Sequence, residues 1–92
     1  MEQDRFRPSP AVRASVSGDG LILLDVDGGL VLSSNAVGAR IWQLLEQRHT
    51  TGEIAQQLVD DYAVPAERAR RDVHTFVADL SARGLVAGDP RP

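Results

Sequence analysis

A chain of 92 residues is long enough for one small hydrophobic core and too short for two domains. Hydrophobic residues make up 42% of the chain and charged residues 25%, as is typical of a globular rather than a disordered protein. The net charge of −3 disfavours nucleic acid as a partner, and the absence of cysteine excludes disulfides, thiol chemistry and cysteine-ligated clusters.

The same sequence gives no sign of a membrane or secreted protein. No segment approaches the roughly 18 continuous apolar residues that a membrane-spanning helix needs. Residues 1–5 are polar and lack the apolar centre of a signal peptide. A chain without cysteine also fits a reducing compartment. We therefore predict a cytoplasmic protein that does not bind membranes.

Three short strands are predicted in the first third of the chain. Residues 1–10 are polar and contain Pro8 and Pro10, so we expect a flexible N-terminal arm there. Residues 11–16 alternate between apolar and polar, which predicts a half-buried strand, and the apolar run 21–26 predicts a second. The loop between them, residues 17–20, makes the pair a hairpin.

The third predicted strand leaves one edge of the sheet open. Asp27, Gly28 and Gly29 favour a tight turn, after which residues 30–32 return antiparallel and residues 33–35 end the strand. No later strand is expected to cover its far side. An open edge needs protection or serves as a docking site for an extended peptide. We favour the docking site.

Three helices are predicted to follow the strands. Asn35 or Ser34 is a suitable N-cap for the first helix, which ends near residues 47–49. Thr50 and Glu53 match the capping-box pattern of a second helix that runs to about Tyr62. A third helix is expected from Pro65 or Ala66 to about Arg83, ended by Gly84, before a polar tail over residues 88–92.

This order of elements predicts the fold class. Three strands followed by three helices indicate an α+β domain over residues 11–87, with the helices covering one face of a three-stranded antiparallel N-terminal sheet. The second helix, the tight turn and the longer third helix resemble a winged helix-turn-helix.

Catalysis has little support in the sequence. His49 and His74 have no patterned carboxylate or thiol partners, and Asp25 and Asp27 are better explained by the hairpin turn than by a metal site. We therefore expect no enzyme activity, no metal and no cofactor. Trp42 lies at the margin of an apolar helix stripe, where core packing is more usual than partner binding.

The third helix has a basic flank. At helical spacing, Arg70, His74 and Ser81 fall beside Val77, next to the apolar stripe. One interpretation is a solvated face with neighbouring charge pairs. The other is the basic wall of a groove that binds an acidic, partly apolar peptide. The pattern leaves both open.

Several segments in sequence order resemble the PqqD-like family. These are the strand, glycine turn and strand that end in Leu-Ser-Ser-Asn at residues 32–35, the helix Val-Gly-Ala-Arg-Ile-Trp-Gln-Leu-Leu at 37–45, Thr-Thr-Gly-Glu-Ile-Ala at 50–55, Asp-Val-x-x-Phe at 72–76 and Ala-Arg-Gly-Leu-Val at 82–86. The resemblance covers about residues 10–87. It implies a winged helix-turn-helix that binds the leader peptide of a ribosomally synthesised precursor and presents it to modifying enzymes.

The resemblance also implies how the peptide binds. The leader adds as a strand beside the third strand, in a groove walled by the third helix. From this mode we infer the peptide-binding residues Leu30, Val31, Leu32 and Ser33 on the strand, and Arg70, Arg71, His74, Val77, Ala78 and Ser81 on the helix. Many relatives carry an aromatic residue in the third strand, where this chain has leucines and a valine, which leaves the leader motif open.

The expected partners are a precursor leader peptide and a separate enzyme, which is a leader peptidase, a cyclase or a radical enzyme. A lasso-peptide pathway is the first choice, and radical-enzyme pathways such as pyrroloquinoline quinone synthesis come next. One rival is a DNA-binding regulator that uses Arg68, Arg70, Arg71 and His74; another is an adaptor that binds only an enzyme. The open edge allows a monomer or a strand-exchanged dimer.

Overall fold

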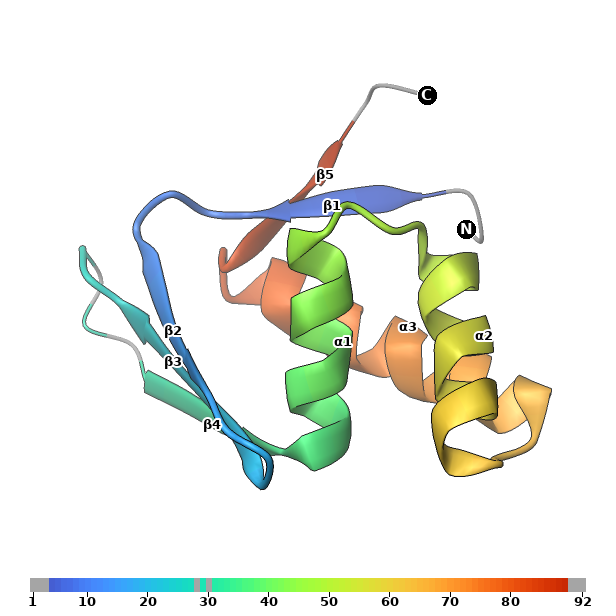
Figure 1. The fold of residues 1–92 in the computed structure, drawn as a ribbon. Helices are drawn as coiled ribbons and strands as arrows, with labels where there is room; N and C mark the ends of the chain where they lie inside the picture. Colours follow the sequence, from blue (N-terminus) through green and yellow to red (C-terminus); the bar gives the residue numbers. More distant parts are fainter. Residues whose placement is uncertain (1–3, 28, 30, 90–92) are drawn as a thin grey trace.

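The computed structural model describes residues 4–27, 29 and 31–89 (Figure 1). Within this part of the chain, five strands and three helices form two small sheets and a helical layer. Their bounds are β1 Arg5–Pro8, β2 Val12–Val16, β3 Gly20–Asp25, β4 Val31–Asn35, α1 Ala36–Glu46, α2 Thr51–Tyr62, α3 Ala66–Ala82 and β5 Val86–Asp89. The predicted α+β class and the order of three strands and three helices are confirmed.

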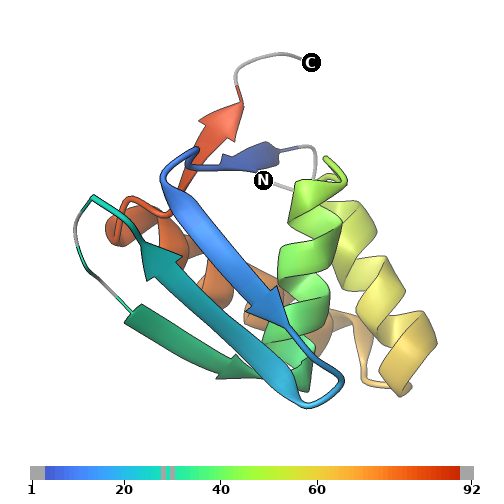
Figure 2. The same ribbon diagram turned by 60° about the vertical axis from the view of Figure 1, so that its left-hand side comes forward.

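Strands β2, β3 and β4 form the predicted antiparallel meander. The order is β2-β3-β4, and Leu23 of β3 lies between Ala14 and Leu32. Leu21 and Leu23 are buried on the face that packs against α1. Figure 2 shows the three strands in front of the helices, so the helices cover only this inner face.

Strand β4 is longer than the sequence predicts. Ser33 and Ser34 do not end it, because both pair with β3 in register and the strand continues to Asn35. Asn35 is also the N-cap of α1, where its Oδ1 accepts from the Gly38 N–H at 3.0 Å. The strand thus passes directly into the helix. In the preceding turn Gly29 has a φ of 68°, whereas Gly28 and Leu30 lie outside the described residues.

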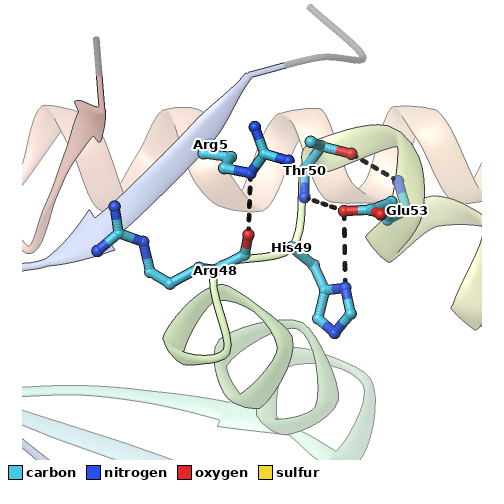
Figure 3. Close-up of polar contacts among 5 residues, drawn as sticks. All are labelled: Arg5, Arg48, His49, Thr50 and Glu53. Carbon is cyan, nitrogen blue, oxygen red and sulfur yellow. Dashed lines mark hydrogen bonds and ion pairs between the residues drawn. The ribbon is translucent and has the colours of Figure 1, made fainter. Parts of the chain in front are cut away.

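The starts of the helices follow the predicted capping. The Thr50 hydroxyl accepts from the Glu53 N–H at 3.1 Å, and Glu53 Oε1 accepts from the Thr50 N–H at 2.7 Å (Figure 3). This capping box satisfies two backbone donors that the helix itself leaves unpaired. Helix α3 begins after Pro65, and Gly84, with a φ of 73°, follows its C-cap as predicted.

The expected flexible arm is wrong for residues 5–8, and the expected tail is wrong for residues 88 and 89. They form β1 and β5, which pair antiparallel with Phe6 opposite Gly88. Phe6 packs against the core, and Arg5 Nε donates to the Arg48 carbonyl at 3.2 Å (Figure 3). Gly84 reverses the chain after α3, and this turn brings the two ends together.

The core lies between the inner face of the sheet, α1 that packs against it, and the pair of helices α2 and α3. Its largest fully buried side chain is Trp42, which is 1% exposed. That burial favours the packing interpretation over a direct contact with a partner. No helix formed by residues 4–27, 29 and 31–89 combines the length and the apolar character that spanning a bilayer requires.

Candidate functional site

The outer edge of β4 is the first feature of the site. Strand β4 bonds to β3 on one side only within the described sheet, so its other edge is open. Residues 31–35 contain no charged residue and no proline, which are the usual means of blocking an edge. The opposite edge strand, β2, carries Arg13. The β4 edge is therefore the better template for an added strand.

The backbone groups that face this edge follow from the hydrogen-bond register. Ser17 donates to the Gly20 carbonyl and Val26 to that of Ala11, so the even-numbered residues of β3 bond to β2. Hydrogen-bonded and non-bonded pairs alternate in antiparallel sheets. The odd-numbered residues of β3 therefore bond to residues 32 and 34 of β4. The N–H and C=O groups of Val31 and Ser33 then point to the open edge.

The side chains of β4 point to both faces. Leu32 is 9% exposed and lies opposite Leu23, so it belongs to the core. Ser33 is exposed and lies opposite Ile22 on the outer face. Of the four predicted strand residues, Val31 takes its place opposite Leu24, and Leu30 lies outside the described residues.

Four of the predicted α3 residues meet around one pocket of about 90 Å³. The other lining residues come from β1, the residue before it and the start of α2. The lining residues are Asp4, Phe6, Thr51, His74, Val77, Ala78 and Ser81. This flank of α3 therefore faces β1 and α2. The sequence instead predicts that this flank lines the groove beside β4.

The opposite flank of α3 lies beside the end of β4. A methyl group added at Gly38, in the first turn of α1, would lie 3.3 Å from Phe76 Cε1 and would overlap Ser34 Oγ. Phe76 thus packs at the junction where β4 enters α1. Helical spacing puts Asp79 and Arg83 on the same flank as Phe76.

The exposed charges on the Phe76 flank are paired along the helix. Arg83 Nε lies 3.1 Å from Asp79 Oδ1, and Arg68 Nε lies 3.7 Å from Asp72 Oδ2. Each pair joins residues four positions apart, so this flank carries balanced charge with an aromatic side chain in the middle. Arg70 shares the His74 flank by helical spacing, and Arg71 points further from the core. Among the described residues, the two arginines on the Phe76 flank each lie beside an aspartate.

Sequence reasoning treated Phe76 as an ordinary member of the apolar stripe. Its place at the margin of that stripe was the one available signal, because a marginal aromatic contacts both the core and the adjacent surface. Phe6 was missed altogether, since it lay in the expected arm. Within the described residues, no group of three or more histidine, cysteine or acidic side chains is placed to hold a metal ion.

Comparisons with known proteins show which family and which solved structures this chain resembles. A search of curated proteins finds no match. Two solved structures match at 30% identity. One, described as TbiB1 in complex with the TbiA(beta) leader peptide, has a TM-score of 0.83 over 92% of this chain and 99% of that chain. The other, lasso peptide synthetase B1 complexed with the leader peptide, has a TM-score of 0.81 over 90% and 98%.

Neither structure supports the DNA-binding alternative. A family model described as coenzyme PQQ synthesis protein D (PqqD) matches residues 20–86, which span β3, β4, all three helices and the first residue of β5. The resemblance noted in the sequence is thereby confirmed: the chain belongs to the PqqD family.

Proposed function

We propose that this chain captures the leader segment of a ribosomally made precursor peptide and presents it to a separate modifying enzyme, without catalysing a reaction itself. The observation that carries the proposal is the uncharged, proline-free open edge of β4. It occurs in a chain that aligns over nearly its whole length with two proteins solved in complex with leader peptides.

The proposed binding mode is addition of a strand to β4. Val31 and Ser33 offer their outward backbone groups, so leader residues opposite them form the hydrogen-bonded pairs. The leader residue between these two then points inward, above Leu32 and toward α3. Ordering a flexible peptide costs conformational entropy, and apolar contacts at this inward position offset part of that cost.

For the wall of the groove we propose the Phe76 flank, with Asp79 and Arg83, because Phe76 packs at the β4–α1 junction. The sequence-based set Arg70, Arg71, His74, Val77, Ala78 and Ser81 stays a prediction. A lasso-peptide pathway is the first expectation for the precursor, and a leader peptidase, cyclase or radical enzyme for the enzyme. The cytoplasm is the expected location, since a cysteine-free chain fits a reducing compartment.

A ¹⁵N–¹H correlation spectrum of the protein, titrated with the leader peptide encoded beside its gene, tests the proposal. We expect saturable shifts at residues 31–35 and on the Phe76 flank of α3. Shifts on the His74 flank instead would favour the sequence-based wall. The absence of any saturable shift with this peptide would contradict the proposed function.

A matched pair of variants at Ser33 tests strand addition itself. Ser33→Pro removes a backbone donor that faces the open edge and leaves the bonds from β3 to residues 32 and 34 in place. We expect the leader affinity to fall by about tenfold, since this is the equivalent of one to two hydrogen bonds in a desolvated ladder. Ser33→Ala keeps the N–H and is the control. Equal affinities in both variants, each with a parent-like fold, would argue against strand addition.

A further inference from the structure

The outer face of the three-stranded sheet is unusually apolar along its middle strand. Strand β3 is the middle strand, and its residues alternate between the two faces. Leu21 and Leu23 are 1% and 0% exposed on the inner face, while Ile22 and Leu24 are 53% and 42% exposed on the outer face. An antiparallel sheet with one solvated face normally carries polar side chains there. This strand has the composition of one that is covered on both sides.

The apolar side chains of the outer face follow β3 and the residue after it, with serine and arginine beside them on the neighbouring strands. In register, Ile22 lies between Ser15 and Ser33, and Leu24 lies between Arg13 and Val31. Val26 follows β3 and is 56% exposed, and its N–H still bonds to the Ala11 carbonyl, so it continues the alternation of residues 22 and 24. Figure 2 shows no helix in front of this face. Clustered exposed apolar side chains are typical of protein interaction sites.

We propose that this outer face, defined by Ile22, Leu24 and Val26, binds the modifying enzyme to which the captured precursor is presented. The inference rests on the proposed function. The occupant follows from continuity with the leader site, because β4 supplies both the open edge and the border of the outer face. The helices cover the inner face of the sheet. The outer face therefore lies next to a bound leader and stays free of the leader groove, and its apolar side chains are available to a second partner.

The bound leader also takes part in this surface. The leader residue opposite Ser33 shares the outer face with it, since directly paired residues on adjacent strands point to the same side. Capture therefore widens the outer face by one strand. An enzyme that contacts both β3 and the leader strand binds the loaded protein more tightly than the empty one. By thermodynamic linkage, the enzyme tightens leader binding by the same factor.

The test uses the double variant Ile22→Thr with Leu24→Thr, because threonine is a β-branched residue that suits a strand and has less apolar surface than either parent residue. Val16→Thr is the matched control, since Val16 is 37% exposed but belongs to β2 on the inner side of the sheet. Affinity for each purified modifying enzyme encoded beside the gene is measured by calorimetry, with and without the leader peptide. Leader affinity is measured separately by the titration described above.

We expect the double variant to bind the leader within about twofold of the parent protein and to lose about tenfold or more in affinity for one of these enzymes. The control should keep both affinities. The leader should also tighten enzyme binding to the parent protein. Unchanged enzyme affinity in a folded double variant would overturn the proposal. If the double threonine variant does not fold, Val26→Arg replaces it, because Val26 lies beyond the last residue of β3. The same loss of enzyme affinity is expected for this variant.

Two other outcomes distinguish a failure of this inference from a failure of the proposed leader-binding function. Self-association of the parent protein that the double variant abolishes, seen by sedimentation, would assign the face to a second copy and overturn the enzyme proposal. Enzyme binding that depends on Ile22 and Leu24 in a protein that fails to bind the leader would support the face and remove the proposed function.

Discussion

Two residues other than glycine have left-handed backbone in the described part of the chain, Arg48 with a φ of 68° and Ala63 with a φ of 54°. Ala63 is the C-cap of α2, and its N–H donates to the Val59 carbonyl at 2.9 Å. A side chain with a Cβ is strained in this conformation, and glycine is the usual residue there. The sharp turn between α2 and α3 thus stores a local cost.

Replacing Ala63 with glycine should therefore stabilise the protein. Glycine removes the left-handed strain, and this gain is larger than the free-energy cost of the extra conformational freedom that glycine gives the unfolded chain. We therefore expect the free energy of unfolding to rise by up to about 1 kcal/mol. Ala82→Gly is the control: Ala82 lies in the last turn of α3, and glycine there should cost about 0.5–1 kcal/mol. Urea denaturation measures both. A loss of stability in Ala63→Gly would contradict the strain argument.

The sequence could supply single-residue roles wherever they depend on local chemistry. Asn35, Thr50, Glu53 and Gly84 all take the capping positions that were predicted for them, because caps depend on residues within four positions. The two flanks of α3 are different. Both lie beside the same apolar stripe, and which of them faces β4 depends on how α3 rotates against α1, which no local pattern encodes.

Helix α2 begins with a network that joins several parts of the molecule. Glu53 closes the capping box on Thr50, and His49 Nδ1 lies 3.6 Å from Glu53 Oε1 (Figure 3). Just before the helix, Arg5 of β1 donates a hydrogen bond to the Arg48 carbonyl. The backbone hydrogen bond from Thr50 is the main cause that holds the pKa of Glu53 below its ordinary value of 4.5, and the charges of His49 and Arg5 act in the same direction.

This lowered pKa predicts a pH dependence of stability. A carboxylate with a depressed pKa in the folded state stabilises the fold above its unfolded pKa, and the contribution disappears as pH falls through the folded value. Glu53→Gln keeps an acceptor for the cap but removes the charge. We expect the parent protein to be more stable than this variant at pH 7, and the difference to vanish below the ordinary value of 4.5. Urea denaturation across this pH range measures it.

The control for that experiment is Glu46→Gln, at the exposed end of α1, which removes one negative charge away from the cap. A pH-dependent difference of the same size in both variants would show that net charge, and not the capping box, is the cause.

At the scale of the whole molecule, the meander and the helices could be predicted and the second sheet could not. Hairpins and helix caps join residues that are close in sequence, so the local turn and capping residues predict them. Strands β1 and β5 pair the first part of the chain with the last, with Arg5 opposite Asp89. Each strand is four residues long, and β1 ends at a proline that favours an irregular segment. Only tertiary pairing makes them strands.

The distribution of charge gives a last prediction, for leader binding. The chain has a net charge of −3, and the flank of α3 beside β4 carries two internally paired sets, Arg68 with Asp72 and Arg83 with Asp79. A leader bound there is held by backbone hydrogen bonds and apolar contacts, which salt screens weakly. We expect its dissociation constant to change by less than about threefold when ionic strength rises from about 0.01 M to about 0.15 M.

The sequence-based wall predicts the opposite. An acidic leader held by Arg70 and Arg71 would weaken steeply over the same range, because exposed charges are screened once the Debye length falls to about 8 Å. Titrations at several salt concentrations separate the two, and Arg70→Glu sharpens the comparison. A shallow dependence with unchanged affinity in Arg70→Glu supports the Phe76 flank. A steep dependence that this variant abolishes would place the leader on the basic flank and contradict the assignment made from the geometry.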